Sequence, residues 1–230
     1  MAQFSPDCRS CHIPLSGIRA VPPRILRGVR RHKKNPNFCN ICSEKAYQGY
    51  IDEITVLFAD IRGFTELTTT YGPLKTRALL DEYFRTASEI FFERDAIVDH
   101  FMGDAIMAFF NAVKPAPDQV AQAVRSAFDL LSLIRHLNTK WALPQPVGVG
   151  IGINHGTAAL GVLGSTNPDD FTAIGETVNI AARLQAQADA GEILVTSEVY
   201  EQVRNAYPDA QPRTFELKGI QGPVEAYVLN

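Results

Sequence analysis

The pattern of apolar and polar positions divides most of the chain into short strands and longer amphipathic helices. Ile54–Ala59 is apolar on both faces and too short for a typical helix, which predicts a buried central strand. Residues 73–92 and 118–137 carry apolar residues at helical spacing, and the first of these helices has a start signal at Gly72-Pro73. The pattern therefore predicts a central strand packed against two amphipathic helices.

Between and after these helices the sequence predicts further strands. Residues 97–110 form two short strands around a turn at Met102–Gly103–Asp104. A glycine-interleaved strand over 147–153 lets another backbone approach closely, and 157–164 pairs back on it after a turn at Asn154–Gly156. The remaining expected elements are a strand over 171–174, a helix from about 177, a strand over 193–196, a helix over 197–206 and a closing hairpin of 214–217 with 224–229. This βαββαβ order with edge additions predicts an α+β sandwich, with helices on one face of a mainly antiparallel sheet.

Length and composition are those of a globular protein. The chain has 230 residues, of which 46% are hydrophobic, enough for one ordinary domain with an appendage. No apolar run approaches the roughly 18 residues of a membrane span. The first residues contain no apolar signal-peptide core, so we expect a soluble, cytoplasmic protein.

Charge is distributed unevenly. Residues 1–45 have a net charge of +7, and the rest of the chain has −10. The basic run Arg24–Lys34 allows nucleic-acid or anionic-lipid binding, but it has almost no interleaved aromatic residues. We expect this region to dock against the acidic domain, its own or a partner's, and do not expect nucleic acid as a partner.

All four cysteines lie in the basic region. Cys8 and Cys11 form one CxxC pair, Cys39 and Cys42 form the other, and the following 188 residues contain none. Paired CxxC motifs present four thiolates to one tetrahedral ion, which predicts a structural zinc site. The alternatives are redox-active or disulfide-bonded cysteines, or no special role. His12 or His32 is available to replace one thiolate.

Two acidic residues follow predicted strands or turns. Asp60 ends the central strand and Gly63 turns the chain into a helix, an arrangement suited to a hard cation and the phosphates it carries. Taken alone, Asp60 is also a reasonable cap for that helix. Asp104 lies at the hairpin turn, where it can reach the end of the central strand, and two such carboxylates are the usual minimum for a two-Mg²⁺ site.

Three motifs in order resemble the class III nucleotidyl cyclase catalytic domain: FADIRGFT, VDHFMGDAIMAFF and FTAIGETVNIAARL. The resemblance covers about residues 52–230 and implies the ferredoxin-like (βαββαβ) sandwich of that family. The domain organisation is then a basic Cys₄ module at 1–45, a connector at 46–52 and a catalytic domain at 53–230.

The resemblance implies a role for each matching residue. Asp60 and Asp104 would bind two Mg²⁺ or Mn²⁺, with the Ile61 carbonyl as a backbone ligand. The substrate phosphates would lie at the helix start formed by Gly63, Phe64 and Thr65. The reaction would be attack of the ribose 3′-hydroxyl on the α-phosphate of a nucleoside triphosphate, with pyrophosphate leaving.

Further residues take family roles at a shared site. Arg183 resembles the transition-state arginine and Asn179 the residue that orients the ribose. Lys218 resembles a lysine that contacts the terminal phosphates, although Ile220 replaces a frequent second lysine. In the family the metal aspartates of one subunit face the Asn/Arg helix of another, which implies a homodimer.

Base recognition is where the chain departs from the family pattern. Adenylyl members carry Lys where this chain has His100, and Asp or Thr where it has Thr172. The pair favours ATP and leaves GTP and pyrimidine triphosphates as alternatives. Two other function classes stay open: an inactive, regulatory cyclase fold, and a nucleic-acid binder that uses the basic module.

Overall fold

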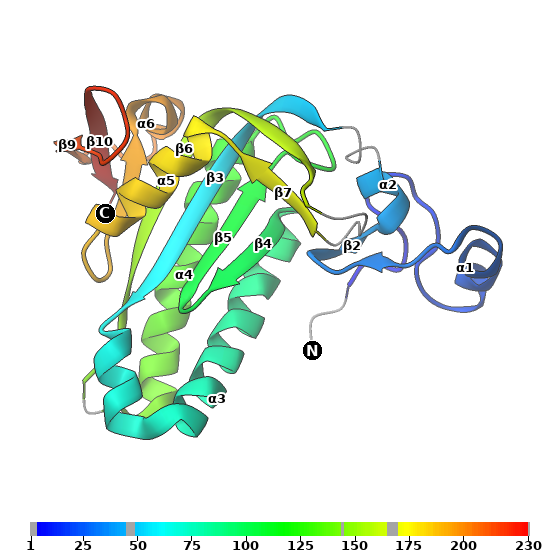
Figure 1. Cartoon of the computed structure of the whole chain (residues 1–230), viewed down its shortest axis with the longest axis horizontal. Coiled ribbons are helices and arrows are strands. Elements are labelled where there is room, and N and C mark those ends of the chain that lie inside the picture. The colour runs from blue at the N-terminus through cyan, green and yellow to red at the C-terminus, as the bar shows by residue number, and fades with distance from the viewer. Residues whose placement is uncertain (1–3, 45–48, 144, 165–169, 230) are drawn as a thin grey trace.

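A twisted sheet organises the larger body of the molecule (Figure 1). The computed structural model describes residues 4–44, 49–143, 145–164 and 170–229. Among these residues the sheet has eight strands, in the order β4-β5-β3-β6-β8-β10-β9, with β7 paired to β6. The strands are β3 (Tyr50–Arg62), β4 (Ile97–Met102), β5 (Ala105–Phe110), β6 (Gly148–Val162), β7 (Phe171–Ile174), β8 (Ile193–Thr196), β9 (Gln211–Glu216) and β10 (Pro223–Leu229). The half made of β4, β5, β3 and β6 has the order and connections of a ferredoxin-like sheet, as predicted.

Helices cover both faces of this sheet. The helices are α3 (Phe64–Glu93), α4 (Gln119–Trp141), α5 (Glu176–Gln187) and α6 (Ser197–Val203). One face packs on α3, α4 and α6, while α5 crosses the other face (Figure 1). The prediction of helices on one face is therefore wrong for α5. Its small inward residue Ala181 matches the glycines of β6, and this fit lets the helix lie directly on the strand.

Strand β3 is the centre of the sheet. It pairs antiparallel with β5 on one side and with β6 on the other. The run from Ile54 to Ala59 is buried on both faces, as its unbroken apolar sequence predicted. The strand begins earlier than expected, at Tyr50, so the connector is shorter than the sequence suggested.

The turn expected at Asn154–Gly156 does not form. Both residues lie inside β6, which runs without a break from Gly148 to Val162 because β3 offers pairing partners along this length. The Asn154 side chain instead donates to the carbonyl oxygen of Thr177 at 3.0 Å. Gly156 leaves room for the Thr177 side chain. These turn-forming residues thus support the start of α5.

Both predicted helix starts near residue 64 and residue 73 occur within α3. The helix begins at Phe64, and Gly72, with φ 72° and ψ 168°, breaks it into two segments. Helix α4 continues past the predicted end to Trp141 and stops at Ala142. None of the helices in the described ranges is long and apolar enough to cross a membrane.

The N-terminal module packs beside β4. Its elements are η1 (Ile18–Ala20), α1 (Val21–Arg27), β1 (Arg31–His32), β2 (Asn35–Cys39) and α2 (Asn40–Glu44). Arg9 forms an ion pair with Asp95 at 2.7 Å, and Lys34 forms one with Asp99. The backbone N–H of Val98 donates to the Lys34 carbonyl oxygen at 3.0 Å. The expectation that the basic region docks on the acidic domain is confirmed within the chain.

The glycines of β6 allow α5 to approach the sheet. A Cβ atom at Gly152 would lie 2.2 Å from the backbone nitrogen of Gln185 and 2.5 Å from the carbonyl oxygen of Ala181. Neither atom belongs to a movable side chain, so any side chain here would displace the helix. The predicted close approach is confirmed, and it fixes the height of α5 above the sheet.

We expect Gly152→Ala to destabilise the protein by about 1–3 kcal/mol, since α5 must shift to admit a methyl group. The measurement is the free energy of unfolding in urea. Gly156→Ala is the matched control, because its nearest neighbour is the Thr177 side chain rather than backbone. Equal losses in the two variants would contradict this account of the packing.

Candidate active site and cysteine centre

Strand β3 and the β4–β5 turn bring two carboxylates to one end of the sheet. In the antiparallel pairing, Asp60 of β3 lies opposite Ala105, the first residue of β5. Asp104 occupies the turn immediately before Ala105, and Gly103 enters that turn with φ 67°. The predicted juxtaposition of Asp60 and Asp104 is therefore present in the structure.

The two carboxylates affect each other electrostatically. Partial burial and the nearby charge of Asp60 raise the pKa of the Asp104 carboxyl to about 6. Burial, followed by the charges of Asp60 and Asp104, also raises the pKa of the Tyr83 phenol. Two carboxyl groups thus lie close together in a partly buried place. A divalent cation bound between them would relieve their repulsion, and carboxylate oxygens are the ligands that Mg²⁺ and Mn²⁺ prefer.

Arg62 is a member of this site that sequence reasoning missed. Its Nη1 atom lies 3.2 Å from Oδ2 of Asp60. Its Nε and Nη2 atoms donate to the carbonyl oxygen of Ala188, at 3.1 and 2.8 Å. The guanidinium thereby joins the end of β3 to the segment that follows α5. The available signal was spacing, because residues two apart on a strand share a face.

The turn after β3 exposes the start of a helix. Gly63 has φ 79°, a left-handed conformation suited to glycine, and α3 begins at the next residue, Phe64. The first N–H groups of a helix have no partners within it and can meet phosphate oxygens. Thr65 is exposed beside them, whereas the Ile61 side chain is buried in the core. Only backbone atoms of Ile61 are therefore suited to bind a ligand.

The other proposed catalytic residues lie on α5 and in the β9–β10 loop, not at the strand end and turn that carry the carboxylates. Asn179 and Arg183 are both exposed on α5, and within the described ranges neither has a hydrogen bond or ion pair with Asp60 or Asp104. Lys218 is exposed in the β9–β10 loop. That loop lies at the opposite end of the sheet, since only the far end of β10 is level with Asp60. Lys218 of one chain therefore does not reach the carboxylates of that chain.

Thr172, the proposed base-reading residue, belongs to a polar cluster between β7 and β4. Its hydroxyl donates to Oδ2 of Asp99 at 2.5 Å. The same carboxylate pairs with Lys34, whose Nζ also donates to the Phe171 carbonyl oxygen at 2.7 Å. His100 lies in β4, but its side chain is outside the described part of the structure. Sequence reasoning missed Asp99 and Lys34; an acidic residue inside an apolar strand was the available signal.

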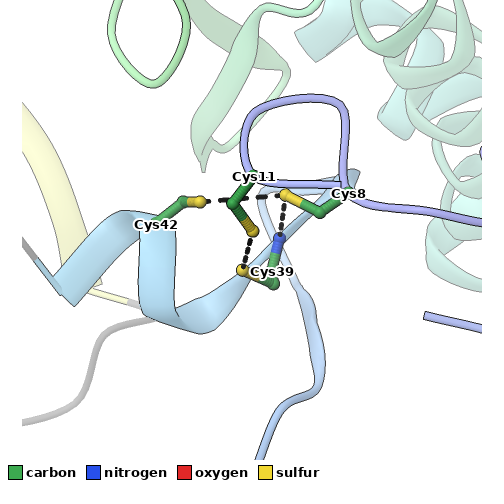
Figure 2. A group of neighbouring side chains, drawn as sticks. All are labelled: Cys8, Cys11, Cys39 and Cys42. Carbon is green, nitrogen blue, oxygen red and sulfur yellow. Dashed lines mark hydrogen bonds between the residues drawn. The ribbon is translucent and has the colours of Figure 1, made fainter. Parts of the chain in front are cut away.

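The four cysteines converge as predicted (Figure 2). Their Sγ atoms all lie within 4.8 Å of one another. The Sγ atoms of Cys8 and Cys42 are 3.8 Å apart, and those of Cys11 and Cys39 are 3.5 Å apart. These distances exceed the roughly 2.05 Å of a disulfide, so the cysteines are free thiols. The group contains no histidine among the residues that the structure describes.

Backbone and side-chain donors around Cys8 favour its thiolate form. Hydrogen bonds from the side chains of Cys39 and Cys42 lower the pKa of the Cys8 thiol. The backbone N–H of Cys39 also donates to Cys8 Sγ at 3.3 Å. The contacts within the group have the opposite effect on Cys39, where hydrogen bonds from Cys42 and Cys8 raise the pKa of the thiol. Because thiolates are the form that binds metal ions, a bound cation would replace the protons that these sulfur atoms share, and the loop carrying Cys8 and Cys11 and the β2–α2 segment form a four-sulfur centre.

Comparison with known proteins identifies the family. Residues 46–230 match the family described as the adenylate and guanylate cyclase catalytic domain. An adenylate cyclase of Anabaena cylindrica is 33% identical over 75% of this chain and 34% of its own length. Adenylate cyclase 1 of Rhizobium meliloti is 29% identical over 76% of this chain and 27% of its own length. This chain thus spans about a third of the length of these two relatives.

Solved structures agree with these matches. The adenylyl cyclase CyaB from P. aeruginosa superposes with a TM-score of 0.73 at 29% identity, covering 79% of this chain and 95% of that one. The guanylyl cyclase Cya2 gives a TM-score of 0.74 at 28% identity, covering 79% and 93%. The sequence match, the fold and the paired carboxylates agree, and the chain belongs to the class III adenylate and guanylate cyclase catalytic domain family.

Proposed function

We propose that the protein is a nucleotidyl cyclase that converts ATP into 3′,5′-cyclic AMP and pyrophosphate. The observation that carries the proposal is the proximity of Asp60 and Asp104, close enough for the charge of one to raise the pKa of the other. A pair of carboxylates with this mutual repulsion is suited to two-metal phosphoryl transfer. The names of the relatives, which include several adenylate cyclases, support the reaction class.

The residues at the end of β3 fit this chemistry. Asp60, Asp104 and the Ile61 carbonyl would hold Mg²⁺ or Mn²⁺, which supplies Lewis-acid activation of the ribose 3′-hydroxyl and charge neutralisation at the triphosphate. The 3′-oxygen bonds to the α-phosphorus, the bond to the bridging oxygen breaks, pyrophosphate leaves, and the hydroxyl proton passes to water. The backbone N–H groups of Gly63, Phe64 and Thr65 would donate hydrogen bonds to the phosphate oxygens.

A second chain is part of the proposal. Arg183 would stabilise the charge on the transferring phosphoryl group, Asn179 would orient the ribose, and Lys218 would contact the terminal phosphates. All three are exposed, and among the described residues none forms a hydrogen bond or ion pair with the carboxylates of its own chain. A two-fold homodimer would place them opposite the partner's carboxylates and form two identical sites.

ATP is the proposed substrate, with GTP and the pyrimidine triphosphates as alternatives. The similar proteins include adenylate cyclases and also Guanylate cyclase 32E of Drosophila melanogaster, at 29% identity. His100 and Thr172 occupy the base-reading positions of the family. Thr172 is a residue found at that position in adenylyl members, which supports ATP.

We also propose that the cysteine centre binds one structural zinc ion. Zn–S bonds of about 2.3 Å in a tetrahedron place the sulfur atoms about 3.8 Å apart. The Cys8–Cys42 and Cys11–Cys39 separations of 3.8 and 3.5 Å fit that geometry. Since the cysteines come from the N-terminal loop and from the β2–α2 segment, a bound ion would tie these two parts of the module together.

Asp104→Ala should abolish formation of cyclic nucleotide while the protein remains folded, because the carboxylate lies in a surface turn. The measurement is Mn²⁺-dependent release of pyrophosphate and cyclic AMP from ATP. Asp209→Ala, which removes an exposed carboxylate elsewhere, should keep wild-type activity. Near-normal activity in a folded Asp104→Ala protein would exclude the two-metal assignment.

The homodimer predicts complementation between two inactive variants. Asp60→Ala and Arg183→Ala should each be inactive alone, yet a mixed dimer has one site carrying both changes and one carrying neither. Random assortment at equal concentrations makes half of the dimers mixed, so activity should recover to roughly a quarter of wild type. If subunits exchange and no activity returns, each site is built within one chain.

Protein purified without chelator should contain about one zinc ion per chain, and Cys39→Ser should lose it. Elemental analysis of the purified protein measures the metal content. Ser16→Ala, in the same module but outside the cysteine group, should keep the ion. A metal-free wild type under reducing conditions, or zinc retained in Cys39→Ser, would refute a four-cysteine site.

A further inference from the structure

The polar cluster at Thr172 is almost closed to solvent. The Asp99 side chain is 2% exposed and the Lys34 side chain is 11% exposed. Charges this buried are costly unless they are paired, and here the carboxylate accepts from both the ammonium group and the Thr172 hydroxyl. Thr172 itself is half-buried and lines a pocket of about 160 Å³ with Gly49 and Leu160. The cluster therefore combines a buried interior with one residue that a ligand can reach.

These contacts fix the direction of the Thr172 hydroxyl. A threonine hydroxyl has one proton and two acceptor lone pairs, whereas an ionised carboxylate only accepts. Because Asp99 takes the proton, the hydroxyl can offer only lone pairs toward the pocket. Thr172 is thus an acceptor for any ligand at this position, although its chemistry alone allows either role.

Nucleobases fall into two classes according to the group that would contact such an acceptor. Adenine and cytosine present an exocyclic amino group, which donates, while guanine and uracil present a carbonyl oxygen at the corresponding position, which accepts. A threonine hydroxyl that can only accept forms a hydrogen bond with the amino group of adenine or cytosine. Against guanine or uracil it faces a carbonyl oxygen, which also accepts, so no hydrogen bond forms. The base class is therefore set by which atom holds the Thr172 proton.

We propose that Asp99 and Lys34 are positioning residues that make this protein select nucleotides with an exocyclic amino group, ATP and CTP over GTP and UTP. Asp99 acts by accepting the Thr172 proton, and Lys34 acts by holding the Asp99 carboxylate in place beside Thr172. The inference rests on the proposed function, since it takes Thr172 as the base-reading residue. It gives the N-terminal module, which supplies Lys34, a part in substrate choice.

Lys34 is well placed for this role. Its Nζ bridges Asp99 and the carbonyl oxygen of Phe171, so it joins β4 to the residue preceding Thr172. Without the ammonium group, the Asp99 carboxylate loses the contact that ties it to the residue preceding Thr172. The Thr172 hydroxyl can then turn its proton away from Asp99 and toward the base. Loss of Lys34 and loss of the Asp99 charge should therefore have the same effect on selectivity.

The test compares binding of the four α,β-methylene triphosphates, which cannot release pyrophosphate, by calorimetry with the full-length protein. Wild type should bind the ATP and CTP analogues at least about fivefold more tightly than the GTP and UTP analogues, the equivalent of about one hydrogen bond. Asp99→Asn and Lys34→Met should each reduce that ratio about fivefold, toward equality. Thr172→Val should remove the preference and Thr172→Ser should keep it.

The matched control for Lys34→Met is Arg9→Met. Arg9 also ties the module to the larger body, through Asp95, but it does not touch Asp99 or Thr172. If selectivity depends on the Thr172 proton, Arg9→Met should leave the ratio of affinities unchanged. An equal change of the affinity ratio in both variants would overturn the proposal, because it would show that weaker docking of the N-terminal module is enough to change selectivity. Thermal melting of each variant verifies folding, and either Lys34→Met or Asp99→Asn suffices if the other is unfolded.

The same proteins, assayed with the natural triphosphates, separate this inference from the proposed function. Selective binding without turnover by wild type would refute the cyclase activity and support the selection mechanism. Turnover with a base ranking that Asp99→Asn and Lys34→Met do not change would support the activity and overturn the mechanism. A wild type that prefers GTP or UTP, or that binds none of the four analogues, would also overturn it.

Discussion

The pairing of β3 with β6 is the interaction on which the rest of the structure depends. Every residue of β3, from Tyr50 to Arg62, lies opposite a residue of β6. This ladder fixes where β3 ends and hence where Asp60, Arg62 and the start of α3 lie. It also presents the glycines of β6 to α5. The end of the sheet that bears the carboxylates and the helix that bears Arg183 are thus positioned by one set of backbone hydrogen bonds.

The two faces of the sheet are covered by different means. One face packs on α3 and α4 through a continuous apolar core of the kind that amphipathic helices provide. On the other face, Phe38 and Cys8 of the N-terminal module join a cluster with Val56 and Phe58 of β3. The module therefore contributes to the core of the larger body. Its removal would take buried side chains out of this shared cluster.

Features that depend on a local sequence pattern could be predicted from the sequence. Features that depend on contacts between distant segments could not. The apolar run at 54–59, the hairpin turn at Asp104 and the CxxC pairs each carry their signal within a few residues, and all three are confirmed. The turn at Asn154–Gly156 was wrong because pairing with β3 overrode the local preference of these residues. The Lys34–Asp99 contact joins positions 65 residues apart, so no local pattern could predict it. Asn179 and Arg183 lie on one exposed face of α5, as their spacing of four residues predicted.

The length of β6 has a consequence for the order in which the chain can fold. Tyr50 pairs with Leu160 and Arg62 with Gly148, so the central ladder joins segments about a hundred residues apart. Long-range pairing of this kind slows folding, because loop-closure entropy is lost before the contacts form. During synthesis, β3 can pair with β5 once residue 110 has emerged, yet its other edge stays open until β6 follows. A nascent chain at that stage exposes an apolar strand edge, the feature that makes folding intermediates prone to aggregation.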